Sequence, residues 1–142
     1  MKLLEKNIAQ ELFQTFCDGY NHRDLEKLLK LFTENTNQWG TAEDEYMTGH
    51  TGIKKQLIRD WNQSEKSRIH VKSFVPTSFD ANWAAAVCQA VITINGTEHT
   101  FDHLRGTIVI EKEDNTWKIA HMHASFPDYR NSAGNSFPLN KV

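Results

Sequence analysis

Trp117-Lys-Ile-Ala-His-Met-His-Ala-Ser-Phe-Pro127 has the alternation of a β-strand that is covered on both faces. Side chains along a strand point alternately to its two faces, so His121 and His123 are aimed at the same face. That face also receives Trp117, Ile119 and Ser125, and the other face receives Lys118, Ala120, Met122, Ala124 and Phe126. Neither set is typical of a solvated surface. The segment therefore predicts a strand of a curved sheet with a pocket on one side and a partner on the other.

Length and composition favour a single domain over residues 1–142, with a core at about 5–127 and a tail at 128–142. Sixteen basic and eighteen acidic residues give a formal charge of -2, and no block of Lys or Arg stands out. This balance argues against nucleic-acid and anionic-membrane partners. No segment resembles a signal peptide or a membrane span, so we expect a cytoplasmic location. Cys17 and Cys88 lack the spacing of a metal site and are predicted to be buried free thiols.

Three helices are predicted in the first half of the chain. An apolar residue at every fourth position predicts the first helix, with the stripe Leu4, Ile8, Leu12, Phe16 and Tyr20. The second is predicted from Asp24 to Phe32 with Asn21 as its N-cap, and it forms a hairpin with the first. The third runs from about Thr51 to Trp61. Its predicted outer face consists of Lys54, Lys55, Arg59 and Asp60.

The pattern of the rest of the chain predicts β-strands. A small two-stranded element is predicted at 37–41 and 46–48, followed by long antiparallel strands at 69–75, 83–94, 100–112 and 117–126. Residues 84–92 are apolar on both faces, as in a central strand covered on two sides. Helices that precede a sheet in the chain indicate an α+β fold, in which they cover one sheet face. A second chain is then expected on the other face.

The last hairpin determines which side chains face each other. Residues 113–115 are predicted to form a three-residue loop with Asn115 in the left-handed region, which asparagine tolerates. This register pairs Lys112 with Thr116, and on one face it pairs Val109 with Ile119, Thr107 with His121, and Arg105 with His123. The opposite face then collects Gly106, Ile108, Ile110, Ala120, Met122, Ala124 and Phe126. A two-residue Asp-Asn turn would shift every pair.

Two local signatures carry a family resemblance. They are Gly40-Thr-x-x-Asp44-Glu45 and the strand Trp117-x-Ile-x-x-x-His123-x-Ser125. With the order of helices and strands over about 5–127, the chain resembles the SnoaL-like branch of the nuclear transport factor two-like superfamily. The second signature also resembles the association domain of the calcium/calmodulin-dependent protein kinase. The resemblance implies a conical α+β domain whose curved antiparallel sheet and three N-terminal helices enclose a cavity, commonly paired as a homodimer through the outer sheet face.

The resemblance also indicates which chemistry to expect. In the ketosteroid isomerases of this superfamily, the catalytic tyrosine, base and buried acid would fall at Phe16, near Gly40 and near Ile108. None of these groups is retained, so proton abstraction by that route is not expected. The two cavity arginines of the kinase association domain match Gln89 and Ile108, which argues against anion binding of that kind.

A pocket is predicted where the first helix and the apolar face of the last hairpin converge. Its predicted lining is Phe16, Tyr20, Trp39, Tyr46, Trp61, Gln89, Ile108, Met122 and Phe126. Ordinary core packing is the alternative for these aromatic side chains. Glu45 is a candidate catalytic carboxylate at the cavity mouth, although loop carboxylates are more often solvated or capping groups.

His121 and His123 have three interpretations. They are candidate acid/base catalysts, or members of a hydrogen-bonded network at a dimer interface. That network consists of Arg105, Thr107, His121, His123 and Ser125. They are also candidate metal ligands, with His99, Asp102 and His103 near in sequence, but an arginine facing His123 disfavours a cation. We expect no metal and no cofactor.

The sequence thus predicts a homodimeric domain that binds a small organic molecule. The alternatives are a metal-independent lyase or isomerase that works by general acid/base catalysis, and a non-catalytic oligomerisation or accessory domain. A carboxylate or histidine converging on a ligand in the cavity would favour an enzyme, and purely apolar walls would favour the accessory domain.

Overall fold

The computed structural model describes residues 7–131 and 133–137 and has the predicted α+β class. Its elements in chain order are α1 (Ile8–His22), α2 (Leu25–Leu29), β1 (Phe32–Trp39), β2 (Tyr46–Thr48), α3 (Gly49–Asn62), β3 (Lys66–Phe74), β4 (Trp83–Ile94), β5 (Thr97–Glu113) and β6 (Thr116–Ser125). The strands form one six-stranded sheet in the order β2-β1-β6-β5-β4-β3. β1 pairs with β6 in parallel, and the other described pairs are antiparallel.

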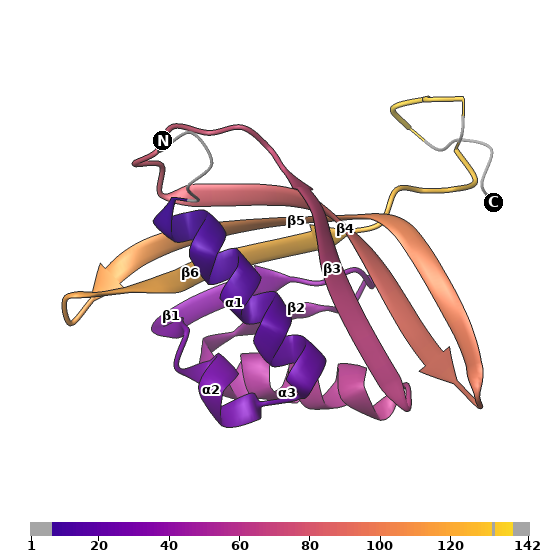
Figure 1. Cartoon of the computed structure of the whole chain (residues 1–142), viewed down its shortest axis with the longest axis horizontal. Helices are drawn as coiled ribbons and strands as arrows, with labels where there is room; N and C mark the ends of the chain where they lie inside the picture. The colour runs from indigo at the N-terminus through magenta and orange to yellow at the C-terminus, as the bar shows by residue number, and fades with distance from the viewer. Residues whose placement is uncertain (1–6, 132, 138–142) are drawn as a thin grey trace.

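The sheet arches over the helices. Figure 1 shows α1 lying across the sheet and α3 below it, with the long β4 and β5 curving around them. The core lies between these two layers and includes Phe13 of α1, Ile53 of α3 and Ile108 of β5. The opposite, outer face of the sheet carries no described helix. No described helix is long and apolar enough to cross a bilayer.

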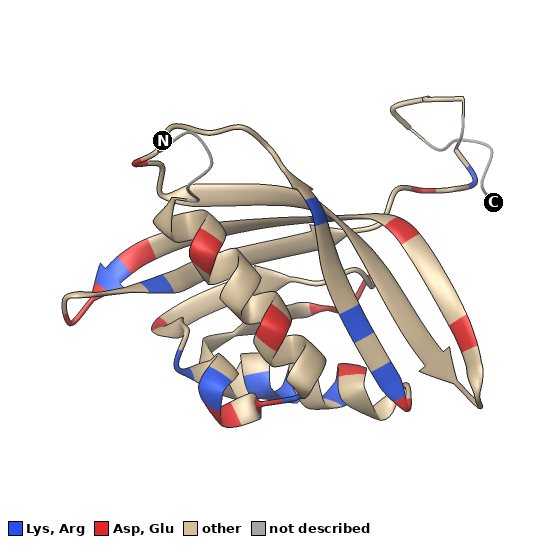
Figure 2. Cartoon of the chain, viewed as in Figure 1, with Lys and Arg blue, Asp and Glu red and all other residues tan. Residues whose placement is uncertain are grey.

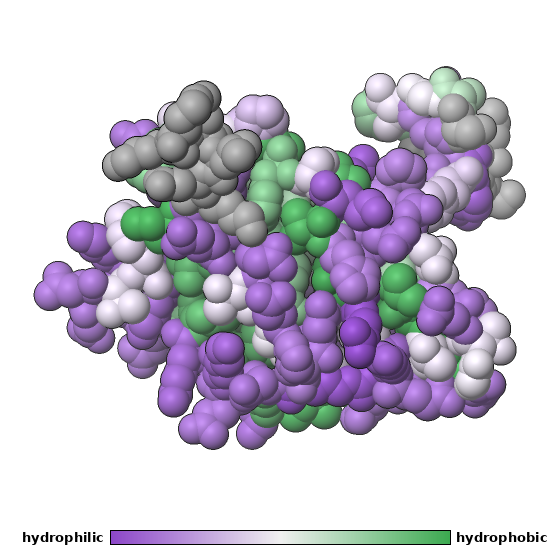
Figure 3. Space-filling model, viewed as in Figure 1, coloured by the Kyte–Doolittle hydropathy of each residue, from purple (hydrophilic) through white to green (hydrophobic). Residues whose placement is uncertain are grey.

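The surface agrees with the balanced composition. In the view of Figure 2, acidic and basic residues are interspersed along the helices and strands, with no face of a single sign. On the same face in Figure 3, polar side chains prevail and hydrophobic ones form separate patches.

α1 starts at a capping box, in which the Asn7 side chain accepts from the Gln10 backbone N–H at 2.8 Å and the Gln10 side chain accepts from the Asn7 backbone at 3.2 Å. Leu4 of the predicted stripe lies outside the described residues. Asn21 does not cap α2, because its side chain instead bonds the backbone of Ile69 on β3. Asp24 takes the capping role through the backbone N–H of Lys27.

α2 is shorter than predicted. The sequence pattern extends the helix to Phe32, whereas the helix ends at Leu29 and Phe32 is the fully buried first residue of β1. Apolar residues three or four positions apart fit a continuous helix face, but they also fit a helix followed by a buried strand residue. Periodicity alone therefore does not distinguish a longer helix from the start of a strand. β1 is therefore a full strand of the main sheet. Its last residues pair antiparallel with β2, which confirms the predicted two-stranded element, and that element is one edge of the six-stranded sheet.

The last hairpin has the shorter turn. Asp114 and Asn115 form a two-residue turn in which both have positive φ, at 51° and 65°, and Glu113 pairs with Thr116. Two left-handed residues match the right-handed twist of the flanking strands, which favours this turn over the predicted three-residue loop.

A register shift at Ala120 then changes the pairing again, because Ile110 pairs with Ile119 while Val109 pairs with His121. Thr107 consequently faces His123, and Arg105 faces Ser125 rather than His123. The shorter turn and the register shift at Ala120 each displace the pairing by one residue. Because the total displacement is two residues, Arg105, Thr107 and Val109 still share a sheet face with the histidines, as predicted. Ile119 was predicted on that face and is instead fully buried in the core.

Cys17 and Cys88 are buried free thiols, as predicted. The hydrogen bond with the Cys88 sulfur, together with burial, raises the pKa of the Cys17 thiol. The described part of the tail has no helix or strand, and the Tyr129 hydroxyl anchors it by donating to the carbonyl of Asp102 on β5.

Candidate functional site

A cavity of about 360 Å³ lies between α1, α3 and the concave side of the sheet. This volume is within the range of ligand pockets in proteins. Its walls come from almost every element, which explains why no single stretch of sequence defines it. The residues that line it are Phe16, Tyr20, Gln38, Trp39, Gly40, Thr41, Ala42, Glu45, Gln56, Leu57, Arg59, Asp60, Gln63, Ser64, Ser67, Ile69, Ala90, Ile92, Ile94, Phe101, Leu104, Met122, Ala124 and Phe126.

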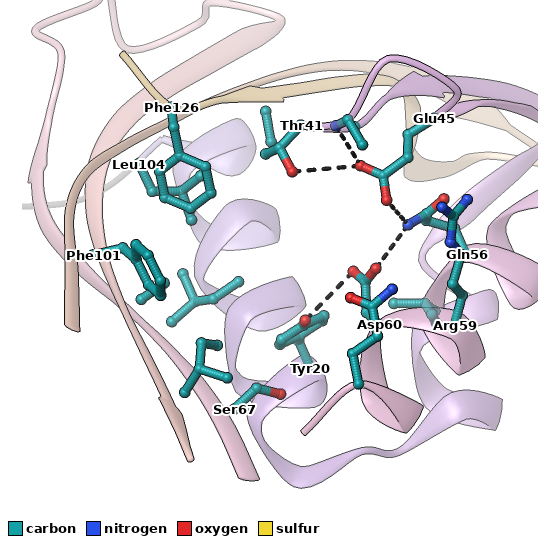
Figure 4. A pocket seen from close by; sticks show the side chains of 18 of the residues that line it. Tyr20, Thr41, Glu45, Gln56, Arg59, Asp60, Ser67, Phe101, Leu104 and Phe126 are labelled. Atoms are coloured by element: carbon teal, nitrogen blue, oxygen red, sulfur yellow. Dashed lines mark hydrogen bonds between the residues drawn. The ribbon is translucent and has the colours of Figure 1, made fainter. Parts of the chain in front are cut away.

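The apolar side of the cavity is built from the ends of the long strands. Phe101 and Phe126 contact each other with ring centroids 5.7 Å apart, and Leu104 and Met122 lie on the same wall. In Figure 4, Phe101, Leu104 and Phe126 lie across the cavity from the polar residues. The cavity is therefore amphipathic from one side to the other.

Glu45 begins the polar side. It is 7% exposed, and one carboxylate oxygen accepts from the Ala42 backbone N–H at 2.7 Å and from the Thr41 hydroxyl at 3.4 Å. A Cβ on Gly40 would lie 2.7 Å from that oxygen, so a glycine is needed for this close approach. The Gly-Thr-x-x-Asp-Glu signature is thus a loop that folds around its own glutamate.

Gln56 links Glu45 to Asp60. Its side-chain nitrogen donates to the second oxygen of Glu45 at 2.5 Å and to Asp60 at 2.7 Å. The Tyr20 hydroxyl, from α1, lies 3.4 Å from the other oxygen of Asp60. Figure 4 shows the chain of contacts from Thr41 through Glu45, Gln56 and Asp60 to Tyr20.

Burial shifts the acidity of this network. Desolvation, reinforced by the charge of Glu45, raises the pKa of the Asp60 carboxyl, and the Gln56 hydrogen bond and the charge of Arg59 only partly oppose it. Desolvation and the nearby Asp60 charge also raise the pKa of the Tyr20 phenol. Asp60 is thus a carboxyl group with a perturbed pKa in a cavity, a common property of functional sites.

The structure places the predicted lining residues differently. Phe16, Tyr20, Met122 and Phe126 line the cavity. Trp39 lies at the edge of the cavity and is 48% exposed. The centroid of its ring is 4.4 Å from that of the Tyr46 ring, with the two planes tilted by 39°.

Four predicted lining residues are not on the cavity wall. They are Tyr46, Trp61, Gln89 and Ile108. Trp61 and Ile108 are buried in the core, because a helix stripe or strand face shows burial but not whether the neighbouring space is filled. Gln89 donates instead to Asp102 of the neighbouring strand.

The two histidines are absent from the cavity wall. Register puts them on the outer sheet face, where His121 contacts the Asn37 side chain at 2.5 Å and His123 is exposed beside Thr107. They and Glu45 therefore do not form one catalytic group. Among residues 7–131 and 133–137, no group of three or more His, Cys, Asp or Glu side chains is placed to hold a metal ion.

Asp60 and Gln56 are the site residues that the sequence patterns missed. Asp60 was assigned to the outer face of the third helix, but it lines the cavity, whereas the apolar Ile58 of the same helix is 39% exposed. One face of α3 consists of positions 53, 56, 57, 60 and 61. This set fits the helical repeat better than the set of apolar residues does. The sequence signal for the polar site was therefore the pair Gln56 and Asp60, four positions apart within that face.

The family model described as the SnoaL-like domain matches residues 9–129. The chain belongs to the SnoaL-like family. This confirms the resemblance to that branch of the nuclear transport factor two-like superfamily. No curated protein matches this SnoaL-like chain at a significant level.

Solved structures share the fold of this SnoaL-like domain. A candidate scytalone dehydratase from Novosphingobium aromaticivorans is 16% identical with a TM-score of 0.68, over 83% of this chain and 80% of that chain. A candidate calcium/calmodulin-dependent protein kinase II association domain from Xanthomonas campestris is 20% identical with a TM-score of 0.70, over 84% and 86%. TerC, crystallised with polyporic acid, is 19% identical with a TM-score of 0.67, over 84% and 91%. At these identities the likeness shows the fold alone.

Proposed function

We propose that this SnoaL-like domain binds a small organic molecule in the cavity between α1, α3 and the sheet. The observation that carries the proposal is the division of the cavity into an apolar side at Phe101, Leu104 and Phe126 and a hydrogen-bonded polar side at Glu45, Gln56 and Asp60. Ligand sites are typically apolar hollows with a few precisely placed polar groups that orient the ligand. That TerC was crystallised with polyporic acid is consistent with a ligand site in this fold.

The test uses two tryptophan substitutions on one strand. Met122 lines the cavity, and its neighbour His123 lies on the outer face. With 2-naphthylmethanol as the probe, we expect Met122→Trp to fill the cavity and weaken binding at least about tenfold, as for a loss of roughly 1.4 kcal/mol. His123→Trp adds the same ring outside and should leave binding unchanged. Wild-type affinity in the Met122 variant would contradict the proposal.

We also propose that the domain forms a homodimer through the outer sheet face. The register aligns Trp83, Val109 and His121 in one row and Ala85, Thr107 and His123 in the next. Trp83 is 38% exposed in the single chain, and no described helix covers this face. A mixed apolar and polar surface of this kind is typical of protein interfaces.

A lyase or isomerase is the second candidate function. The observation that favours it is the raised pKa of Asp60 beside the Tyr20 hydroxyl, because burial of a carboxyl group next to a second proton carrier suits general acid/base catalysis. In this version Asp60 and Glu45, rather than His121 or His123, carry the proton. Mass spectrometry of a bound compound after incubation separates the functions, since a binding protein returns it unchanged.

A further inference from the structure

The cavity has an unbalanced charge. Its charged lining residues are Glu45, Arg59 and Asp60, and the Arg59 guanidinium is bonded at 3.3 Å to both carboxylate oxygens of Asp44. The ion-pair partner of Arg59 thus lies outside the cavity lining. Among the ion pairs of the described residues, none involves Glu45 or Asp60. Two carboxyl groups therefore share the polar wall without a cation in contact.

Gln56 has no amide hydrogen left for a further contact on this wall. Both hydrogens of the Gln56 amide nitrogen are used on Glu45 and Asp60. The Gln56 oxygen is buried and has no hydrogen-bond partner within the described part of the chain. An unsatisfied buried acceptor and an uncompensated carboxylate are both costly. A ligand that brings donors and a positive charge would compensate the carboxylates of Glu45 and Asp60.

We infer that the cavity selects a protonated primary amine attached to an apolar ring, with Asp60 as the counter-ion of its ammonium group. The inference rests on the proposed function, that the cavity takes a small organic molecule. An ammonium group supplies a charge and three donors, whereas a hydroxyl supplies one donor. The ring of the ligand then lies against Phe101, Leu104 and Phe126 on the opposite side. A carboxylate ligand is disfavoured, because two like charges already occupy the polar wall.

Proton linkage follows from the groups that face Asp60. These are Glu45 from the β1–β2 loop, Tyr20 from α1 and Arg59 from α3, with Arg23 acting on Tyr20 from the end of α1. Burial and Glu45 raise the pKa of Asp60 in the free protein, and an ammonium beside it lowers that pKa in the complex. Binding of the amine therefore releases protons at a pH between the two values, and the release disappears at higher pH.

The experiment compares three probes with one ring system: 2-naphthylmethylamine, 2-naphthylmethanol and 2-naphthoate. Titration calorimetry of the full chain should show the amine binding about ten- to a hundredfold more tightly than the alcohol, the range expected for a charge-assisted hydrogen bond. The carboxylate should bind most weakly. Repeating the amine titration in buffers of different ionisation enthalpy measures the released protons in the wild-type protein, without any variant.

Variants then assign the preference to Asp60. Asp60→Asn should remove the advantage of the amine, so that the affinities of this variant for the amine and the alcohol differ by no more than about twofold, or about 0.4 kcal/mol. Glu43→Gln is the matched control, because it removes one carboxylate at an exposed position of the same region and should keep the preference.

Equal affinity for amine and alcohol, a preference that survives in Asp60→Asn, or the absence of proton release would each overturn the amine inference. All three results leave small-molecule binding intact. Failure of all three probes to bind would overturn the inference and count against the proposed function itself.

Discussion

At the scale of single residues, the two carboxyl groups of the cavity differ in how they are held. Glu45 accepts from a backbone N–H, a hydroxyl and an amide, so its oxygens are well satisfied. Asp60 has one short hydrogen bond, from Gln56, and a long contact with Tyr20. Hydrogen bonds therefore hold Glu45 in place, and Asp60 is the carboxyl group with accepting capacity left for a ligand.

We predict that Asp60→Asn changes how stability depends on pH. Burial raises the pKa of Asp60, so the folded state holds this proton more tightly than the unfolded state does. Between the unfolded and folded pKa values, folding stability therefore falls as pH rises, and above the folded pKa the full penalty is present. The asparagine variant lacks this penalty, so its stability relative to wild type should increase with pH over that window and then level off.

Urea unfolding of both proteins from acidic to neutral pH is the measurement. Asp18→Asn, at an exposed position of α1, is the control and should show no such trend. A relative stability of Asp60→Asn that is constant across the range, or that decreases with pH, would show that Asp60 is not destabilised as a carboxylate.

At the scale of secondary-structure elements, local patterns predicted most of the fold. The helix stripe of α1, the alternation of β6 and the apolar run of β4 each depend on residues within one element, and the helix and both strands form. The faces differ in detail, because Ile8 of the predicted stripe is 45% exposed and the register shift in β6 turns Ile119 into the core. The end of α2 and the register of the last hairpin depend on packing with distant residues. Neither follows from periodicity, because Phe32 satisfies both a helix face and a buried strand position.

The candidate site was harder to predict than the fold for the same reason. Phe16 and Met122 lie on apolar stripes, so their inward direction follows from the sequence. Asp60 is charged, and its place in the cavity depends on a network that links it through Gln56 of the same helix to Glu45 of a distant loop. A charged helix residue is ordinarily assigned to solvent, and only the three-dimensional arrangement shows that it is enclosed.

The β5–β6 turn makes a prediction at this scale. Asn115 has φ of 65°, a conformation that costs an alanine about 1–2 kcal/mol. We expect Asn115→Ala to lower the free energy of unfolding by roughly that amount. Asn115→Gly should be neutral or stabilising, since glycine adopts positive φ without a steric penalty.

Chemical denaturation of the two variants beside wild type measures the difference. Because both substitutions remove the same amide side chain, a lost side-chain interaction would affect them equally. Equal destabilisation of the alanine and glycine variants would therefore contradict the positive φ of Asn115.

At the scale of the whole molecule, the uncovered sheet face predicts self-association. Val109 lies in the row between Trp83 and His121 on the outer face. If this face is the dimer interface, Val109→Lys places a charge within it, and the dissociation constant should rise at least about tenfold, or roughly 1.4 kcal/mol. Sedimentation velocity across a concentration series gives the dissociation constant.

Glu98→Lys is the comparison, because it adds a lysine at an exposed position near the far end of β5 and should preserve the dimer. A wild-type protein that sediments as a monomer at micromolar concentration would remove the basis for the proposed interface. Both variants should keep the cavity, since neither residue lines it.

The parallel pairing of β1 with β6 has a consequence for synthesis of the chain. β1 follows the first two helices, yet its main partner in the sheet is the last strand, and its other partner is the three-residue β2. While the ribosome is still making β3 to β5, β1 has only that short neighbour, and Phe32 lacks its contact with Ile119. Long-range pairing of this kind slows folding and prolongs the exposure of strand edges. A chain stalled before residue 116 should therefore be a chaperone substrate, and release of β6 from the exit tunnel should be the step that completes the domain.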